Sequence, residues 1–284
     1  MNILSQTRIQ VNHLLRSWVS ILSFTITTVL VLLNFILNVK TFRGTDVNAM
    51  IEPMRMLALS YEANVYDMRM MGIVYIPIIL SVFSGLPAGL SFAKDRQLCM
   101  DVMLTAKLGR KAYCLSRLMA VFITTFIIFS VPFFIEIVLN CISFPLEANG
   151  NYMQWSIYND SLKTAVGNYM FSGLYLASPY LYAVLCTLMF GIIAGLSATF
   201  TFALTLVIKL RYRIFYVLPV FILFQISIRL YANSDQKLNS LSLIHYIMFF
   251  DDTPKNYPFF FAAIIIALAF IVFAYVFGSR EDTL

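Results

Sequence analysis

Long apolar runs alternate with short polar segments along the whole chain, a pattern that predicts helices crossing a membrane. A helix needs about 20 apolar residues to span the hydrocarbon core. Six stretches approach or exceed that length: 18–39, 72–93, 115–141, 174–210, 214–230 and 257–277. We therefore expect an all-α integral membrane fold, a single domain over 1–284 with six transmembrane helices. An even number of crossings places both termini on the same side.

The residues before the first stretch repeat apolar side chains every three or four positions, with Arg8 and Arg16 between them. The repeat comprises Ile3, Leu4, Val11, Leu14, Leu15 and Trp18. This spacing predicts an amphipathic helix lying along the membrane surface. The helix could be a plain anchor or part of a docking surface for a partner. No small-residue cleavage site follows the first stretch, so we expect a retained helix and not a signal peptide.

Charge predicts the orientation of the chain. The loop between the second and third stretches, 94–114 and the start of the next stretch, is strongly basic and contains only two acidic residues, Asp95 and Asp101. Its basic residues are Lys94, Arg96, Lys107, Arg110, Lys111 and Arg117. Lys209, Arg211 and Arg213 fill another short loop on the same predicted side. Because basic loops stay inside, we expect both termini in the cytoplasm and a multi-pass protein of the cell membrane.

Three longer loops fall on the outer side: 41–71, 143–173 and 232–256. The first repeats Met54, Leu57, Tyr61 and Val65 at helical spacing, and the second has the pattern of an interfacial helix. The apolar centre of the third, 241–250, is too short to cross and is expected to dip into the outer leaflet. These loops could simply cover the bundle, or they could gate or bind a substrate.

Composition excludes several classes of protein. Hydrophobic residues make up 60% of the chain and charged residues 12%, and the mean hydropathy of +0.81 does not fit a soluble domain. The net charge is +6, but the basic residues flank the apolar runs, where they orient the chain in the bilayer. We therefore expect no nucleic-acid partner.

Recognisable catalytic chemistry is also missing from the sequence. The two histidines, His13 and His245, are far apart, which makes a histidine metal centre implausible. No phosphate-binding loop and no G-x-S-x-G elbow occurs. We therefore expect no catalytic residue, metal or cofactor in this chain, which is not an enzyme by itself. If ATP drives it, another chain must bind the ATP.

Glu136 is the one acidic residue within a predicted span, near its outer end and close to Asn140. Ionisable groups inside a membrane are costly and mark ion pathways, so their scarcity argues against an ion relay. Glu136 could hold the structure together or line a pathway. Two pairs with small-x-x-x-small spacing, Gly85–Gly89 and Gly191–Gly195, predict close helix packing, within the subunit or at a dimer interface. The long stretch 174–210 is expected to tilt, to extend beyond the bilayer or to kink at Pro179.

The basic loop carries a family resemblance. It begins Phe92-Ala-Lys-Asp-Arg-Gln-Leu-Cys-Met-Asp and continues to Met103-Leu104-Thr105 and Gly109-Arg110, with Tyr113 and Arg117 following. This segment resembles the one after the second span of type-2 family ABC transporter permeases, where an acidic residue after Phe-Ala leads into a short amphipathic helix and a Gly-Arg turn. Cys99 stands where that family usually has glycine, and the proline usual after the threonine is absent.

The resemblance implies that the loop is a coupling helix seated in a cytoplasmic ATP-binding subunit, which would hold the ATP and Mg. Polar contacts would come from Asp95, Arg96, Asp101 and Arg110, and apolar contacts from Leu98, Met100, Val102, Met103 and Leu104. It also implies a second permease copy, as a homodimer or a related heterodimer, in a bacterial plasma membrane. The alternative is a basic loop without a partner.

By the same resemblance, the chain would form an export pathway lined by aromatic and sulfur side chains. The candidates are Phe126, Phe129, Glu136, Tyr175, Tyr182, Met189 and Phe200. Such a lining suits an amphipathic or hydrophobic cargo, for example an antimicrobial or toxin-like peptide. Two other classes stay open: a non-transporting sensor or immunity subunit that acts through its outer loops, and an ion-coupled secondary transporter.

Overall fold

The computed structural model describes residues 3–44, 53–59, 78–87, 109–144, 169–208, 212–231, 233, 235–247 and 255–278. All regular structure in these ranges is helical, which confirms the predicted all-α class. Four helices in these ranges are long and apolar enough to cross a membrane. They are α2 (Trp18–Thr41), α5 (Arg110–Ser143), α9 (Pro179–Val207) and α12 (Tyr257–Gly278).

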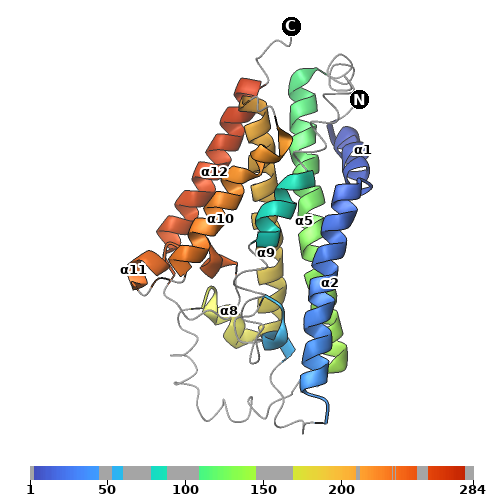
Figure 1. Ribbon diagram of the computed structural model, residues 1–284, viewed down its shortest axis with the longest axis vertical. Coiled ribbons are helices and arrows are strands. Elements are labelled where there is room, and N and C mark those ends of the chain that lie inside the picture. Colours follow the sequence, from blue (N-terminus) through green and yellow to red (C-terminus); the bar gives the residue numbers. More distant parts are fainter. Residues whose placement is uncertain are drawn as a thin grey trace.

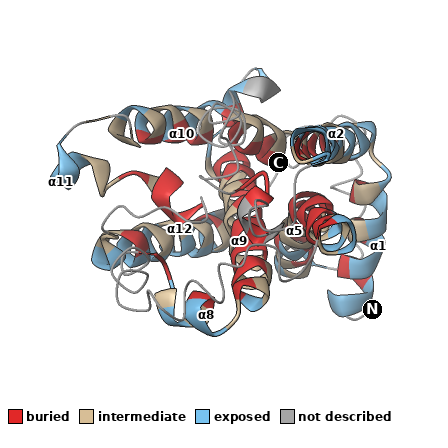
Figure 2. Cartoon of the chain, turned by 90° about the horizontal axis from the view of Figure 1, so that it is seen from below, coloured by how far each residue is buried: buried red, intermediate tan, exposed pale blue. Residues whose placement is uncertain are grey.

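The centre of the bundle is the pair α5 and α9 (Figure 1). Helices α1 (Ile3–Leu15) and α2 lie against α5, and α12 lies along α9 with α10 (Leu218–Tyr231) nearby. Seen along the bundle, buried residues concentrate on α5 and α9, whereas the surrounding helices expose their outer faces (Figure 2). The two central helices therefore form the core that positions the other elements.

Side-chain contacts fix the direction of each helix. Asn34 meets Glu136 and the rings of Phe42 and Phe144 lie 6.2 Å apart, so α2 and α5 are parallel. Helices α9 and α12 are also parallel, because their later residues Phe200 and Phe270 meet with ring centroids 4.9 Å apart. Parallel neighbours need a connection that returns along the bundle. Helix α10 makes that return between α9 and α12 (Figure 1).

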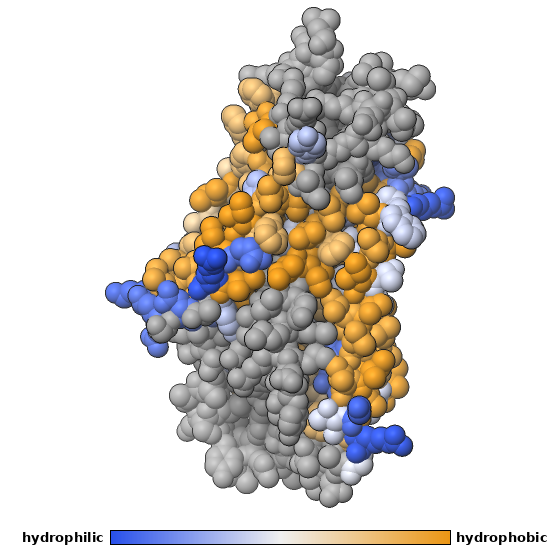
Figure 3. Space-filling view, in the orientation of Figure 1, coloured by the Kyte–Doolittle hydropathy of each residue, from blue (hydrophilic) through white to orange (hydrophobic). Residues whose placement is uncertain are grey.

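Helix α2 turns its polar residues inward and its apolar residues outward. Ser20, Ser23, Thr27, Asn34 and Asn38 are buried along one stripe, while Trp18 is 76% exposed. Helix α12 has the same apolar exterior, and hydrophobic residues cover the middle of the described surface (Figure 3). A surface of this kind is stable against lipid tails and not against water.

The N-terminal stretch that was predicted to lie along the membrane surface is helical, as α1, and it turns three polar residues and Leu14 toward the protein. Gln6, Thr7 and Gln10 are buried, and the Gln10 amide donates a hydrogen bond to the Ser116 hydroxyl at the start of α5, at 3.2 Å. Leu4, by contrast, is 74% exposed. Arg8, Asn12 and His13 are exposed as well, so the outer face of this helix is mixed, and its attachment to the bundle is partly polar.

The Gly191–Gly195 pair lets α9 approach α5 closely, as the spacing predicts. A Cβ atom on Gly191 would lie 1.9 Å from the Ser130 hydroxyl oxygen, and one on Gly195 would lie 2.7 Å from the Phe122 ring. A Cβ atom on Gly85 would lie 3.2 Å from the Thr201 hydroxyl oxygen of α9, so the packing there is similar but looser. These glycines serve packing within one chain.

Of the three alternatives expected for 174–210, the kink at Pro179 is wrong. The chain forms α8 (Ser172–Ala177), breaks at Ser178, and restarts as α9. Ser178 caps α9 by accepting a hydrogen bond from the Leu181 backbone at 3.4 Å, and Pro179 occupies the first turn, where its missing N–H costs nothing. The proline therefore starts a helix and does not kink one.

Two other predicted spans are represented by shorter apolar helices. For 214–230, the turn η4 (Arg213–Tyr216) precedes α10, whose 14 residues extend about 21 Å at 1.5 Å per residue. This is less than the thickness of a hydrocarbon core. For 72–93, the structure describes a helix over Ile78–Pro87, and the rest of that predicted span lies outside the described residues.

The described part of the third outer loop folds back onto α10. It contains α11 (Gln236–Asn239) and η5 (Leu243–Tyr246). The Ser242 hydroxyl donates to the Ser227 carbonyl at 2.8 Å, and the Ser227 hydroxyl accepts from the Leu243 backbone at 2.9 Å. Tyr246 stacks on Phe260 of α12 with ring centroids 4.4 Å apart, and burial raises the pKa of its phenol. The turn thus links α10 to α12.

Candidate functional site

Glu136 lies fully buried on α5 and binds two other segments of the chain. Its Oε1 atom accepts a hydrogen bond from the Asn34 amide of α2 at 2.7 Å and one from the Ala58 backbone N–H at 2.9 Å. Its Oε2 atom is buried and has no hydrogen-bond partner among the described residues. One carboxylate oxygen therefore holds three parts of the fold together.

The segment held by Glu136 belongs to 41–71, the first of the loops predicted on the outer side. It begins with η2 (Pro53–Met56), and the Met56 carbonyl accepts hydrogen bonds from the amides of Asn34 at 2.9 Å and Asn38 at 2.8 Å. Met54 and Leu59 are completely buried. Residues 53–59, which we call the inserted segment, thus enter the bundle and exclude solvent from Glu136.

These contacts favour the structural role of Glu136 among the two roles that the sequence left open. A buried carboxylate is costly unless donors compensate it, and here two donors from separate segments do so on one oxygen. The Asn34 amide uses both of its hydrogens, one for Glu136 and one for Met56. This cluster of Glu136, Asn34, Asn38 and the backbone of Met56 and Ala58, which we call the clasp, joins α2, α5 and the inserted segment.

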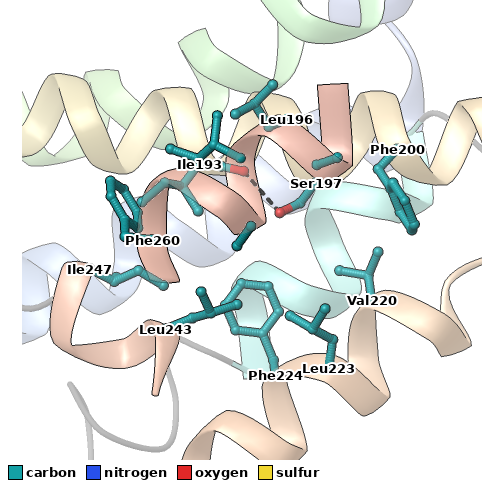
Figure 4. A pocket seen from close by; sticks show the side chains of 13 residues that line it. Ile193, Leu196, Ser197, Phe200, Val220, Leu223, Phe224, Leu243, Ile247 and Phe260 are labelled. Atoms are coloured by element: carbon teal, nitrogen blue, oxygen red, sulfur yellow. Dashed lines mark hydrogen bonds between the residues drawn. The ribbon is translucent and has the colours of Figure 1, made fainter. Parts of the chain in front are cut away.

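A second feature is an apolar cleft of about 150 Å³ between α9, α10, η5 and α12. Figure 4 shows Ile193, Leu196 and Phe200 of α9 facing Val220 and Phe224 of α10 across it. Its lining carries no charged residue among those described, and the hydroxyl of Ser197 donates to the Ile193 carbonyl of its own helix at 2.9 Å. The cleft therefore offers contact area and no polar recognition.

The predicted pathway residues fall into different surroundings. Phe129, Tyr175 and Tyr182 are almost completely buried in the main core, and Phe126 contacts the α9 backbone at Gly191. Met189 packs at the edge of a cluster around Phe260. Phe200 lines the apolar cleft, and Glu136 belongs to the clasp. The structure thus places Phe200 at the apolar cleft, and the role of all seven in a pathway stays a prediction.

The predicted coupling residues lie outside the described part of the chain, except that Arg110 is the first residue of α5. The structure does describe where this segment joins the bundle. Leu14, Tyr113 and Phe202 share one hydrophobic cluster, and Tyr275 packs against it. The start of α5 therefore contacts α1 and the ends of α9 and α12.

Sequence reasoning missed the clasp and the cleft. Asn34 and Asn38 lie one helical turn apart in an apolar span and continue the stripe of Ser20, Ser23 and Thr27. Polar residues at that spacing on a membrane helix indicate an inward face with partners, so the signal was present. No such signal marked the cleft, because its apolar lining residues are of the same types as residues that face lipid.

Among the described residues, no group of histidine, cysteine and carboxylate side chains could hold a metal ion. Searches against protein-family models, curated proteins and solved structures found no match to this chain.

Proposed function

We propose that the chain is a membrane-spanning permease subunit of an ABC exporter, working with a cytoplasmic ATP-binding subunit and a second permease copy. Both termini face the cytoplasm. The chain supplies the path for an amphipathic or hydrophobic substrate such as an antimicrobial or toxin-like peptide, and the partner supplies ATP hydrolysis with Mg. The resemblance of 92–117 to the coupling segment of type-2 family permeases is the starting point of the proposal.

The observation that carries the proposal furthest is that the described residues flanking the two basic loops lie at one end of the bundle. The start of α5, directly after the basic loop, packs with α1 and with the ends of α9 and α12. The Tyr216 hydroxyl donates to the Ile208 carbonyl at 2.9 Å, which brackets the second basic loop, and Figure 1 places this turn at the same end. This placement supports the proposal, because the positive-inside rule would put both basic loops on the cytoplasmic side.

The helix directions support six crossings. Because α2 and α5 are parallel, the chain between them must return along the bundle, and α10 returns between α9 and α12. Four long helices and two returns would give the six passes that we propose. The shorter α10 would complete its pass with the folded turn of α11 and η5, which is packed against it.

The packing at the cytoplasmic end suggests how a partner's movement would enter the bundle. A displacement of the coupling segment would push on the first turn of α5, and the hydrophobic cluster of Leu14, Tyr113 and Phe202 would pass it to α1 and α9. Packed helices move as rigid bodies between discrete arrangements. ATP-driven closure of two nucleotide-binding subunits would thus be converted into a shift between two permease copies.

The test is co-expression with candidate ATP-binding subunits and purification in mild detergent. The loop variant changes Asp95, Asp101 and Arg110 to alanine. The matched control changes Arg229, Asp235 and Lys237, which are exposed on α10 and beside or within α11, to alanine. We expect wild type and control to retain an ATPase that the loop variant loses. Equal retention by all three, or no ATPase with wild type, would contradict the proposal and direct attention to the outer loops.

A further inference from the structure

The apolar cleft exists because α10 stands away from α9 and α12. Helix α10 reaches the central bundle through Val220 and Phe224, while Leu243 and Ile247 of the folded turn close one side of the cleft (Figure 4). On α12 the facing positions are Ala263 and Ala267. These small side chains, one helical turn apart, leave space that larger residues would fill.

The cleft opens on a surface that is itself apolar. Leu223 lines the cleft and is 47% exposed, and its neighbours Ile222 and Ile226 on α10 are 51% and 53% exposed. On α12, Ile265 and Leu268 are exposed beside the alanines. A bilayer around the four long helices would cover this surface with hydrocarbon, so the mouth of the cleft meets lipid tails.

The size and chemistry of the cleft select its occupant. A cavity of about 150 Å³ lined by aliphatic and aromatic residues stays dry and accepts a benzene-sized apolar group. Empty space in a close-packed interior forfeits dispersion contacts on every wall. A peptide segment would bring N–H and C=O groups that need partners, and the one hydroxyl in the lining already donates within α9. A hydrocarbon chain needs none.

We propose that the cleft binds the methyl end of an acyl chain of a membrane phospholipid, which fills the space between α10 and the α9–α12 pair. The headgroup stays outside, because no charged or free polar side chain in the described lining could hold it. The bound chain joins α10 to the bundle where direct contacts are sparse. This inference depends on the membrane exterior of the protein and not on the export proposal.

The experiment uses the full chain in lipid nanodiscs containing phosphatidylcholine with a diazirine near the methyl end of one acyl chain. After irradiation, mass spectrometry maps the adducts. We expect adducts concentrated at cleft residues away from the outer surface, such as Phe224 and Ile264. An even spread over the outward faces of α2, α10 and α12 would overturn the proposal.

Cleft-filling variants and a matched control sharpen the result. Ala263→Phe and Ala267→Phe place a ring in the cleft, whereas Ile266→Phe adds a ring to the outer face of the same helix, where Ile266 is 68% exposed. We expect cleft labelling to be lost in the first two variants and kept in the third. Persistent cleft labelling in folded Ala263→Phe and Ala267→Phe would contradict the assignment.

Two further probes need only the wild-type chain. A phosphatidylcholine with its diazirine near the carbonyl end should not label the cleft, because that end of the chain lies outside it. A phosphatidylglycerol with the terminal diazirine should label the cleft as strongly as phosphatidylcholine does. Labelling from the carbonyl end, or a clear dependence on the headgroup, would overturn the proposal of a chain-only site.

Discussion

The Asn34 side chain of α2 donates a hydrogen bond of 2.7 Å to the buried carboxylate of Glu136 on α5. The same amide donates to the Met56 carbonyl of the inserted segment. Two residues 102 positions apart in sequence thus join a membrane helix, its parallel neighbour and a piece of the outer loop. Much of the stability of this end of the bundle should depend on this contact.

Glu136→Ala should destabilise the fold, because it leaves the buried Ala58 N–H without its acceptor. An unsatisfied buried group costs about 1–3 kcal/mol. Glu136→Gln keeps a carbonyl oxygen at the same place and should retain most of the stability. Thermal unfolding of the purified protein in detergent measures the difference. Equal unfolding midpoints for both variants and wild type would show that the clasp is unimportant.

Asn38→Ala removes one of the two donors to the Met56 carbonyl and should loosen the inserted segment. We expect a cysteine placed at Ala58, which is 6% exposed, to react slowly with a water-soluble maleimide in a cysteine-free background. The reaction should become faster when Asn38→Ala is added, because local opening becomes less costly. Thr41→Ala, whose hydroxyl bonds only within its own helix, should leave the rate unchanged.

The four long apolar helices were predictable from the sequence, because the thickness of the bilayer sets the length of an apolar run that crosses it. The starts of the first and last predicted spans agree with α2 and α12. The break at Ser178 was not recognised, because a proline in an apolar run was interpreted as a kink, although Ser-Pro is also a helix start. The short α10 depends on its packing with Ser242 and Leu243, which periodicity does not reveal.

Gly191→Ala should separate α5 from α9, because the new Cβ would lie 1.9 Å from the Ser130 hydroxyl oxygen. Overpacking of this kind costs about 1–3 kcal/mol. Adding Ser130→Ala should restore part of the loss, because the Ser130 hydroxyl has no hydrogen-bond partner among the described residues. Gly173→Ala, with open space around the new Cβ, is the matched control. Thermal unfolding of the three variants and of wild type tests the prediction, and no difference between the Gly191 and Gly173 variants would contradict it.

Tyr246→Phe should weaken the link between the folded turn and α12 while keeping the ring on Phe260. The hydroxyl donates to the Asn256 carbonyl at 2.8 Å and accepts from the Asn256 backbone at 2.9 Å. Losing both bonds should cost about 1–2 kcal/mol. Tyr257→Phe is the control, since Tyr257 is 40% exposed. Faster proteolysis near the turn in the Tyr246 variant alone would support the assignment, and identical rates would count against it.

The candidate site was less predictable than the fold. Glu136 stood out because an acidic residue in an apolar span is rare, but its partners Asn34 and Ala58 come from distant segments. The aromatic pathway candidates illustrate the opposite problem. Phe129 and Phe200 look alike in sequence, yet one is buried in the core and the other lines the cleft, because three-dimensional packing decides which face a residue meets.

The claim that the basic loop couples this chain to an ATPase is tested most directly by photocrosslinking in living cells. A photoreactive amino acid is placed at Val102 in the loop and, as a control, at Thr41, the last residue of α2. We predict that Val102 crosslinks to a protein that mass spectrometry identifies as a nucleotide-binding ATPase subunit, and that Thr41 does not. No ATPase adduct from Val102, or equal adducts from both positions, would contradict the permease account.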